Sequence, residues 1–183
     1  IYYLTEKYER SLIILNNALL IANELNDDEL LGTVNSELGI LYSYLRQEVK
    51  SMQFYQKSYE HFNRAGKEFL AINSLRNIAI NHAINARYEQ AITLYKKIIA
   101  SADRFANDEI MASVYSGMAW AHLKKEDRSP EAAYQYILIA GQYVANTQQY
   151  GSQLFHATDK AYILFELKRY EEALESIDAA SQL

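Results

Sequence analysis

The chain has 183 residues, half of them apolar, and a formal net charge of −5 at pH 7. The negative charge argues against a nucleic-acid partner, because phosphate binding relies on clustered Lys and Arg. Cysteine is absent, which excludes disulfide and thiol chemistry. The longest apolar runs, such as Leu12 to Leu15, fall far short of the roughly 18 residues that a membrane-spanning helix needs. We therefore expect no direct membrane insertion by this segment.

The composition favours helix throughout, with one proline and six glycines. We predict an all-α fold with no strand. The predicted helical segments, in chain order, are residues 1–4, 7–25, 28–45, 48–65, 68–86, 88–105, 108–124, 130–147, 151–167 and 170–182. We interpret residues 1–4 as the last turn of a separate helix.

The sequence begins with Ile1 and shows no secretion-signal pattern. We therefore expect residues 1–183 to form a single helical-repeat domain that is one segment of a larger protein. A cysteine-free chain suits the cytoplasm and the periplasm equally, so the compartment stays open.

Small residues recur with a period of 40 or 41 residues. One series lies in every second helix and is followed four residues later by a bulky apolar side chain. Its members are Ser11, Ser51, Ala91, Ala132 and Ala173. A second series lies in the helix before each of these, at Gly39, Ala79, Ala119 and Ala161. Small residues let two antiparallel helices approach closely where they cross, so the two series predict stacked helical hairpins.

The residues at these positions resemble tetratricopeptide repeats. Leu38-Gly39-Ile40-Leu41-Tyr42 matches the L-G-x2-Y signature of the first helix, and Ala91-x3-Tyr95 follows the A-x3-F signature of the second with Tyr for Phe. The resemblance covers essentially the whole chain and implies a right-handed solenoid of about five repeats. The period is longer than the usual length of about 34 residues. It is similar to the extended variant in sensor segments of bacterial signalling proteins, such as diguanylate cyclases and histidine kinases. A HEAT-like array is the structural alternative.

In the tetratricopeptide family the first helix of each hairpin lines a concave groove, and the resemblance implies the groove residues here. These lie one position after the small residue, at Ile40, Ile80, Trp120 and Tyr162, and three before it, at Ser36, Arg76, Ser116 and Thr158. Tyr44, Ile84 and Phe165 lie further along, and Asn73 and Asn77 flank Arg76. Our main binding candidates are Tyr44, Asn73, Arg76, Asn77, Ile80, Trp120, Thr158 and Tyr162. Trp120 is the best single candidate, with packing into the next hairpin as its alternative role.

Nothing in the sequence indicates catalysis, a cofactor or a metal site. The four histidines, His61, His82, His122 and His156, belong to no HExxH motif or catalytic triad. We interpret His82 and His122 as polar-tipped residues that are partly buried between helices. Carboxylate clusters such as Asp27-Asp28-Glu29 fall at predicted helix starts, where the helix dipole explains them.

The functional expectation is a non-enzymatic module that binds a peptide or protein segment in its groove, as the sensor or regulatory part of a bacterial signalling protein. The alternative is a receptor for a small molecule or signal peptide whose groove closure controls an attached output domain. Homo-oligomerisation through the terminal hairpins is a further possibility.

Overall fold

The computed structural model describes residues 2–101, 107–147 and 150–181. Over these residues the chain is a succession of α-helices without a strand, which confirms the predicted all-α class. The helices are α1 (Tyr2–Leu25), α2 (Asp28–Tyr44), α3 (Glu48–Arg64), α4 (Glu68–Ile84), α5 (Tyr88–Ile99), α6 (Asp108–Lys124), α7 (Pro130–Val144), α8 (Tyr150–Glu166) and α9 (Tyr170–Ser181). Within the described parts of the chain, none of these helices is both long and apolar enough to cross a membrane.

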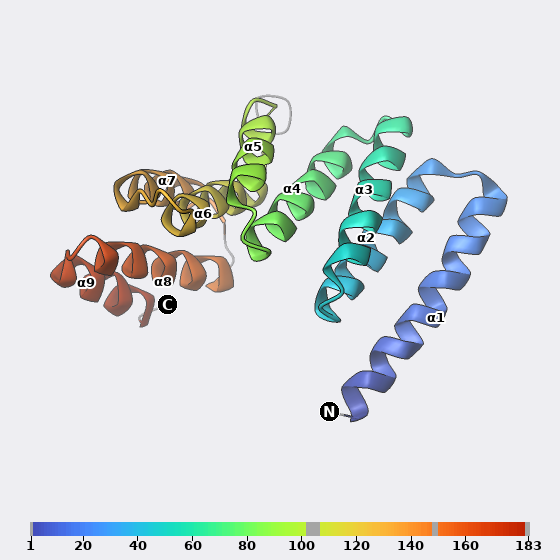
Figure 1. The fold of residues 1–183 in the computed structure, drawn as a ribbon, viewed down its shortest axis with the longest axis horizontal. Helices are drawn as coiled ribbons and strands as arrows, with labels where there is room; N and C mark the ends of the chain where they lie inside the picture. The colour runs from blue at the N-terminus through green and yellow to red at the C-terminus, as the bar shows by residue number, and fades with distance from the viewer. Residues whose placement is uncertain (1, 102–106, 148–149, 182–183) are drawn as a thin grey trace. The chain divides into compact units, whose positions relative to one another are not determined.

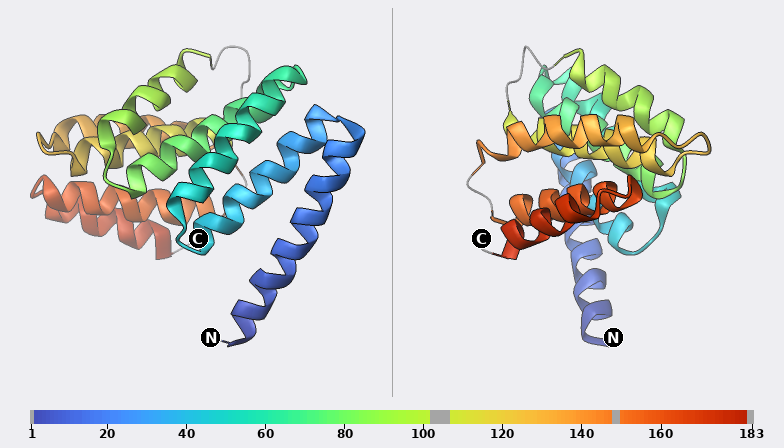
Figure 2. Two further views of the ribbon diagram at one scale, coloured as in Figure 1. Left: turned by 45° about the vertical axis from the view of Figure 1, so that its right-hand side comes forward. Right: turned by 90° about the vertical axis from the view of Figure 1, so that its left-hand side faces the viewer.

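The helices divide into two compact units, Ile1–Asn81 and His82–Leu183. In unit 1, α2 packs against α1 and α3 (Figures 1 and 2). In unit 2, α6 pairs with α7 and α8 pairs with α9, while α7 contacts α8 and α6 lies beside α8. Each pair is an antiparallel hairpin joined by a short connection, as Figure 1 shows for α8 and α9. This is the predicted solenoid architecture of stacked helix pairs.

The turns repeat as regularly as the helices do. Left-handed backbone occurs at Asn26, Arg46, Gly66 and Ala86, twenty residues apart, with φ between 51° and 65°. After each of these four residues, the next backbone N–H donates back to the carbonyl five positions earlier, as Lys67 does to Phe62 at 2.8 Å. This is the Schellman ending of an α-helix. Gly66 takes this left-handed position at the end of α3.

Polar side chains cap the starts of α2, α6 and α7. Asp27 accepts a hydrogen bond from the backbone of Leu30 at 3.0 Å, and Asn107 accepts one from Ile110 at 2.9 Å. Ser129 caps α7, and Pro130 occupies its first turn. These side chains satisfy N–H groups that have no partner inside the helix.

Two boundary predictions are wrong. Residues 1–4 do not end a separate helix, because α1 continues from Tyr2 to Leu25. The intervening residues, Thr5 and Glu6, are neither Gly nor Pro. The helix predicted over 88–105 ends as α5 at Ile99, and residues 102–105 of that prediction lie outside the described part of the chain.

The predicted small-residue register is confirmed at most positions and is off by one residue in α7. Ser51, Ala91 and Ala119 are fully buried. In α7, however, Ala133 is fully buried and Ala132 is only half-buried. The buried positions of α7 are therefore Ala133, Ile137, Ala140 and Val144, because the connection before Pro130 is two residues longer than those within the other hairpins. With this shift, the buried position four residues on is Ile137 in place of Tyr136.

Candidate functional site

The strongest candidate site lies in unit 2, where the first helices of two successive hairpins run side by side. Trp120 of α6 and Tyr162 of α8 each follow a buried alanine, Ala119 and Ala161. Their rings stack with centroids 5.3 Å apart and planes inclined by 23°. The Trp120 ring contacts the next hairpin and also remains partly exposed. Its position is therefore compatible with both predicted roles, a binding residue and a packing residue.

Lys124 completes this surface one helical turn after Trp120. Its ammonium group donates a hydrogen bond to the Tyr162 hydroxyl at 2.9 Å. The same group lies 5.3 Å from the centroid of the Trp120 ring and 4.7 Å from that of Tyr162. A cation at this distance is attracted by the negative face of an aromatic ring. We call Trp120, Tyr162 and Lys124 the aromatic platform.

Three charged residues border the aromatic platform. Burial raises the pKa of Asp159, although a hydrogen bond from Trp120 acts in the opposite direction. Glu166 forms an ion pair with Arg128, and the hydrogen bond from Arg128 is the main cause of its lowered pKa. Lys124 itself makes no ion pair with a carboxylate within the described residues. The platform therefore keeps one exposed positive charge beside two aromatic faces.

Tyr162 also borders a pocket of about 480 Å³ between α8 and α9. Its walls are almost entirely apolar and include the predicted site residue Thr158. The remaining lining residues are Ala161, Phe165, Tyr170, Ala173, Leu174 and Ile177. Thr158 itself donates its hydroxyl to the carbonyl of Leu154 at 2.8 Å, an ordinary helical contact.

The other predicted site residues lie in unit 1. Tyr44 is exposed at the end of α2 and lines a second pocket of about 490 Å³ between α1 and α2, together with Ile40 and Glu37. Asn73, Arg76, Asn77 and Ile80 are half-buried on α4. The predicted site residues of unit 1 therefore lie on two helices. Three half-buried polar side chains and Ile80 are on α4, and the exposed Tyr44 is on α2.

Arg76 lies close enough to Tyr55 of α3 to affect its titration. Burial raises the pKa of Tyr55 to about 12, while the positive charge of Arg76 acts to lower it. The Tyr55 ring occupies the space beside Gly39, where a Cβ atom would come within 2.5 Å of it. Arg76 therefore sits next to the packed crossing of α2 and α3.

The structure thus brings Trp120 and Tyr162 together, with Thr158 on the adjoining pocket. Sequence reasoning missed Lys124 and Asp159. Both carried a usable signal, because Lys124 follows Trp120 by four residues and Asp159 precedes Tyr162 by three, and such spacings share one helix face.

All four histidines are half-buried, which confirms the interpretation of His82 and His122 as partly buried side chains. Burial is the main cause of a lowered pKa at His82, His122 and His156. No group of three or more metal-binding side chains occurs in the parts of the chain that the structure describes.

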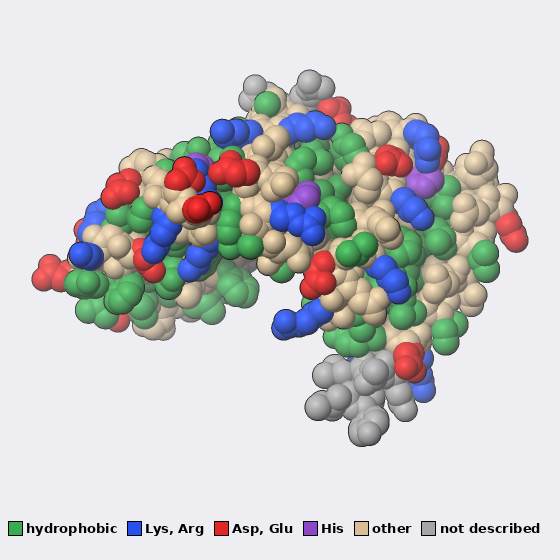
Figure 3. Space-filling view, viewed as in Figure 1, with side chains coloured by type: hydrophobic (Ala, Val, Ile, Leu, Met, Phe, Trp, Pro, Cys, Tyr) green, Lys and Arg blue, Asp and Glu red, His purple; other side chains and the backbone are tan. Residues whose placement is uncertain are grey.

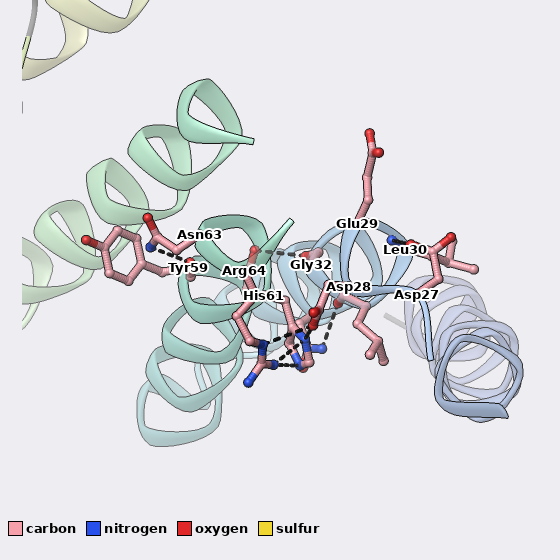
Figure 4. A network of polar contacts seen from close by, with 12 residues as sticks. Asp27, Asp28, Glu29, Leu30, Gly32, Tyr59, His61, Asn63 and Arg64 are labelled. Atoms are coloured by element: carbon pink, nitrogen blue, oxygen red, sulfur yellow. Dashed lines mark hydrogen bonds and ion pairs between the residues drawn. The ribbon is translucent and has the colours of Figure 1, made fainter. Parts of the chain in front are cut away.

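The fourth histidine, His61, belongs to a polar network that the sequence did not predict (Figure 4). Its Nδ1 lies 2.6 Å from a carboxylate oxygen of Asp28, and Nε of Arg64 donates to the same oxygen at 3.0 Å. The hydrogen bond with His61 is the largest cause of the lowered pKa of Asp28. The network joins the start of α2 to the end of α3, where the two helix dipoles favour these charges. We interpret the network as a structural contact that stabilises the α2–α3 hairpin.

Comparison with known proteins supports the fold. No protein-family model matches the chain, and no curated protein matches it by sequence. Among solved structures, BtubC (BKLC) from P. vanneervenii superposes with a TM-score of 0.82 at 18% identity, over 96% of this chain and 72% of that protein.

Two further solved structures are similar over nearly the whole chain. The apo form of the quorum sensor NprR from B. thuringiensis has a TM-score of 0.81 at 24% identity, over 97% of this chain and 49% of NprR. A Rap protein complexed with Competence and Sporulation Factor has a TM-score of 0.78 at 14% identity, over 96% of this chain and 49% of that protein. The chain therefore spans about half the length of these two proteins. At such identities the likeness concerns the fold alone, which is a tetratricopeptide-like helical-repeat solenoid.

Proposed function

We propose that this chain is a non-enzymatic module that binds a peptide or protein segment, and that the aromatic platform of Trp120, Tyr162 and Lys124 is its main contact site. The observation that carries the proposal is the stacked Trp120–Tyr162 pair beneath an ammonium group. Aromatic and cationic side chains in one exposed cluster are typical of residues that dominate binding energy in protein interfaces.

The chemistry of the platform specifies its ligand class. The two ring faces and the adjoining apolar pocket accept an aliphatic or aromatic side chain. Lys124 attracts a carboxylate, from an acidic side chain or a chain terminus, because it has no ion-pair partner in the described residues. We therefore expect an extended peptide that carries an apolar residue next to an acidic group.

The similar solved structures also support a peptide ligand. NprR, which resembles this chain in fold, has been solved in complex with its cognate peptide NprX. By this analogy we propose that the chain is the sensor or regulatory segment of a bacterial signalling protein. The net charge of −5 supports a partner other than nucleic acid.

The test uses Trp120 as its own reporter, because it is the only tryptophan of the chain. A displayed library of random decapeptides is selected on the wild-type protein, and the enriched peptides are titrated while the tryptophan emission is followed. We expect an emission change on binding, and at least tenfold weaker binding to Tyr162→Ala and Lys124→Ala, a typical loss for a dominant contact. Phe69→Ala, which removes an exposed aromatic from unit 1, is the matched control.

The proposal is wrong if the enriched peptides bind Tyr162→Ala and Lys124→Ala as tightly as the wild type. It is equally wrong if Trp120→Ala, folded by circular dichroism, enriches the same sequences. Amidated versions of the peptides separate the contribution of a terminal carboxylate from that of an acidic side chain.

A second candidate function is supported by the pocket between α1 and α2. A volume of about 490 Å³ lies within the range of small-molecule sites. Tyr44, Ile40 and Leu41 give it an apolar wall, and Lys7 and Glu37 supply charge. We therefore propose as the alternative a receptor for a small molecule, whose closure controls an attached output domain. Saturation-transfer NMR with a fragment library tests it, and retention of every hit by Tyr44→Ala would contradict it.

A further inference from the structure

A further pocket of unit 2, of about 400 Å³, lies between α8 and α9 on the side of this hairpin that faces α7. A Cβ atom placed on Gly141 of α7 would lie 2.8 Å from Nε2 of His156, which lines the pocket from α8. Its lining residues are distinct from those of the apolar pocket beside Tyr162. We call it the polar pocket, after its charged and hydroxyl groups on Lys160, Glu172, Glu175 and Ser176.

The polar pocket and the apolar pocket lie on opposite sides of α9. With about 3.6 residues per helical turn, Ser176 and Ala179 of the polar pocket point away from Leu174 and Ile177 of the apolar pocket. In the preceding hairpin, the counterpart of Ile177 is Ile137, which packs against α8. A helix that continues the array would therefore meet the Ile177 side of α9 and leave the polar pocket as it is.

The polar pocket occupies the place of an aromatic cluster in the preceding hairpin. There the ring of Tyr136 on α7 lies 6.4 Å from that of Tyr115 and 5.1 Å from that of His122, both on α6, measured between centroids. In the α8–α9 hairpin the counterparts of these residues are smaller or aliphatic and all line the pocket: Ser176, Ala157 and Leu164. The cavity therefore follows from three replacements that remove the aromatic filling.

Ser176 places a hydroxyl in this cavity without a protein partner. The residue is only 8% exposed, and its hydroxyl makes no hydrogen bond with any described residue. The buried serines of unit 1 differ, because Ser51 donates to the carbonyl of Gly39 and Ser58 to that of Gly32. Buried polar groups are normally hydrogen-bonded. The Ser176 hydroxyl is therefore available to a ligand in the pocket.

The two helices also bring opposite charges to the polar pocket without pairing them. Lys160 of α8 and Glu175 of α9 both line it, and neither forms an ion pair with a described residue. Lys160 is close enough to add to the effect of burial in lowering the pKa of His156. The carboxylate of Glu172 is already paired with Arg169. The pocket thus offers one free ammonium group and one free carboxylate.

This combination selects a ligand that carries both charges. An anion alone would leave Glu175 unpaired, and a cation alone would leave Lys160 unpaired. Acidic and basic side chains are also interspersed over the face of unit 2 that Figure 3 shows, so neither sign of charge dominates that face. A volume of about 400 Å³ lies within the range of small-molecule sites.

We propose that the polar pocket binds a free aliphatic amino acid in its zwitterionic form. Lys160 pairs with the ligand carboxylate, Glu175 pairs with its ammonium group, and the Ser176 hydroxyl donates to the carboxylate. Ala157 and Leu164 provide an apolar wall for the ligand side chain. The proposal goes beyond the peptide function, since it concerns a different ligand and a set of side chains outside the aromatic platform.

Isothermal titration calorimetry with free amino acids tests this proposal. The probes are L-valine, L-leucine, L-isoleucine and L-methionine, each at concentrations up to the millimolar range. We expect binding of at least one of them. Its N-acetyl derivative lacks the ammonium group and its amide lacks the carboxylate, so each should bind about tenfold more weakly or worse.

Variants of the two charges locate the site. Lys160→Met and Glu175→Gln should each weaken binding of the amino acid by about tenfold. Lys96→Met and Glu171→Gln remove the same charges at exposed positions outside the pocket, and should bind as the wild type does.

Ser176→Tyr tests the origin of the cavity. It restores the side chain of the counterpart Tyr136, so it should fill the polar pocket and abolish binding while circular dichroism shows a folded protein. If this variant fails to fold, Lys160→Met and Glu175→Gln still decide the matter, because both side chains are at the pocket surface.

Three results would overturn the proposal. The first is that none of the four amino acids binds, and the second is that the N-acetyl derivative or the amide binds as tightly as the free amino acid. The third is binding that Lys160→Met and Glu175→Gln leave unchanged, because this would place the ligand elsewhere on the chain.

Discussion

The two units solve the same packing problem with different chemistry. In unit 1 the helix crossings contain buried polar groups: Ser51 donates to the carbonyl of Gly39 at 2.9 Å, and Ser58 donates to that of Gly32 at 2.8 Å. The hydroxyls of Ser58 and Ser74 lie 2.8 Å apart. In unit 2 the counterparts of Ser51 and Ser58 are alanine or isoleucine, and the crossings are apolar.

The difference shows that the repeat requires a small or well-packed side chain at each crossing and does not require polarity. Hydrogen bonds across unit 1 fix the register of neighbouring helices, since a sliding helix would leave buried hydroxyls without partners. Unit 2 gains its packing from apolar area and aromatic stacking, as between Tyr115 and Tyr143 at 5.7 Å. We therefore expect substitutions at the apolar crossings of unit 2 to affect stability differently from those at the polar crossings of unit 1. Four measurements test this contrast.

The largest effect is expected from Ala91→Arg in unit 2. Ala91 is fully buried at the crossing position that Ser51 occupies in unit 1. A buried, unpaired guanidinium would cost roughly 3 to 5 kcal/mol of unfolding free energy, enough to loosen or unfold the unit. Thermal unfolding followed by circular dichroism measures this, with the exposed neighbour Gln90→Arg as control. An unchanged midpoint would refute the proposed register.

The next effect is expected from Ser58→Ala in unit 1. The substitution removes the donor to Gly32 and one partner of Ser74, so we expect a loss of about 1 to 2 kcal/mol. Ala140→Ser, the reverse exchange at the counterpart in unit 2, adds a hydroxyl to an apolar crossing and should also destabilise. Denaturant titration measures both. If Ser58→Ala proves neutral, the hydrogen bonds of unit 1 contribute no net stability and the contrast fails.

A smaller effect is expected at the turns. Ala86 in unit 2 has a φ of 56° and Gly66 in unit 1 has a φ of 65°. A side chain in left-handed backbone costs roughly 1 kcal/mol, so Ala86→Gly should stabilise and Gly66→Ala should destabilise by about that amount. No atom lies within 4 Å of a Cβ placed on Gly66, which leaves backbone strain as the cause. Equal signs for the two variants would contradict this explanation.

The smallest effect is a gradual dependence on pH, because the groups concerned are only partly buried. His82, His122 and His156 lie in unit 2 with the pKa of each lowered below 6.5, chiefly by burial. The folded state then binds fewer protons than the unfolded state, so their contribution to stability is complete above pH 6.5 and is lost as pH falls towards the folded pKa. The raised pKa of Asp159 opposes this loss at lower pH.

In unit 1, the lowered pKa of Asp28 makes its contribution complete above pH 3.8, and this contribution is lost only below that value. Tryptophan emission follows unit 2 alone, since Trp120 is the only tryptophan. We therefore expect the denaturant concentration at the unfolding midpoint, followed by tryptophan emission, to decrease as the pH is lowered from 7.5 to 5.5. His122→Gln should reduce this fall, and an invariant midpoint would show that the histidines contribute nothing.

Most of the fold could be predicted from sequence because its signals are local. Small residues at helix crossings, caps such as Asn107 and the stop at Gly66 each act within one or two turns of helix. The register error at Ala132 arose where local signals do not distinguish two neighbouring residues. Ala132 and Ala133 are adjacent and equally small, so only the length of the preceding connection decides which one faces the core.

The candidate site was less predictable because it depends on contacts between hairpins. Trp120 and Tyr162 could be paired through the family pattern, but the position of the Lys124 ammonium over both rings depends on side-chain conformation. The exposure of Phe165 and Ile177 likewise depends on what covers each hairpin. Their counterparts Leu123 and Ile137 have similar side chains and are fully buried.

The spacing of the left-handed residues at 46, 66 and 86 has a practical consequence for engineering. Residues 47–86 begin and end at the same point of a turn, so a copy of this segment inserted after Ala86 would meet matching backbone at both junctions. Such a cassette would lengthen the array by one hairpin without a designed linker. Because the turns are regular, the length of the array could be changed in steps of one whole repeat.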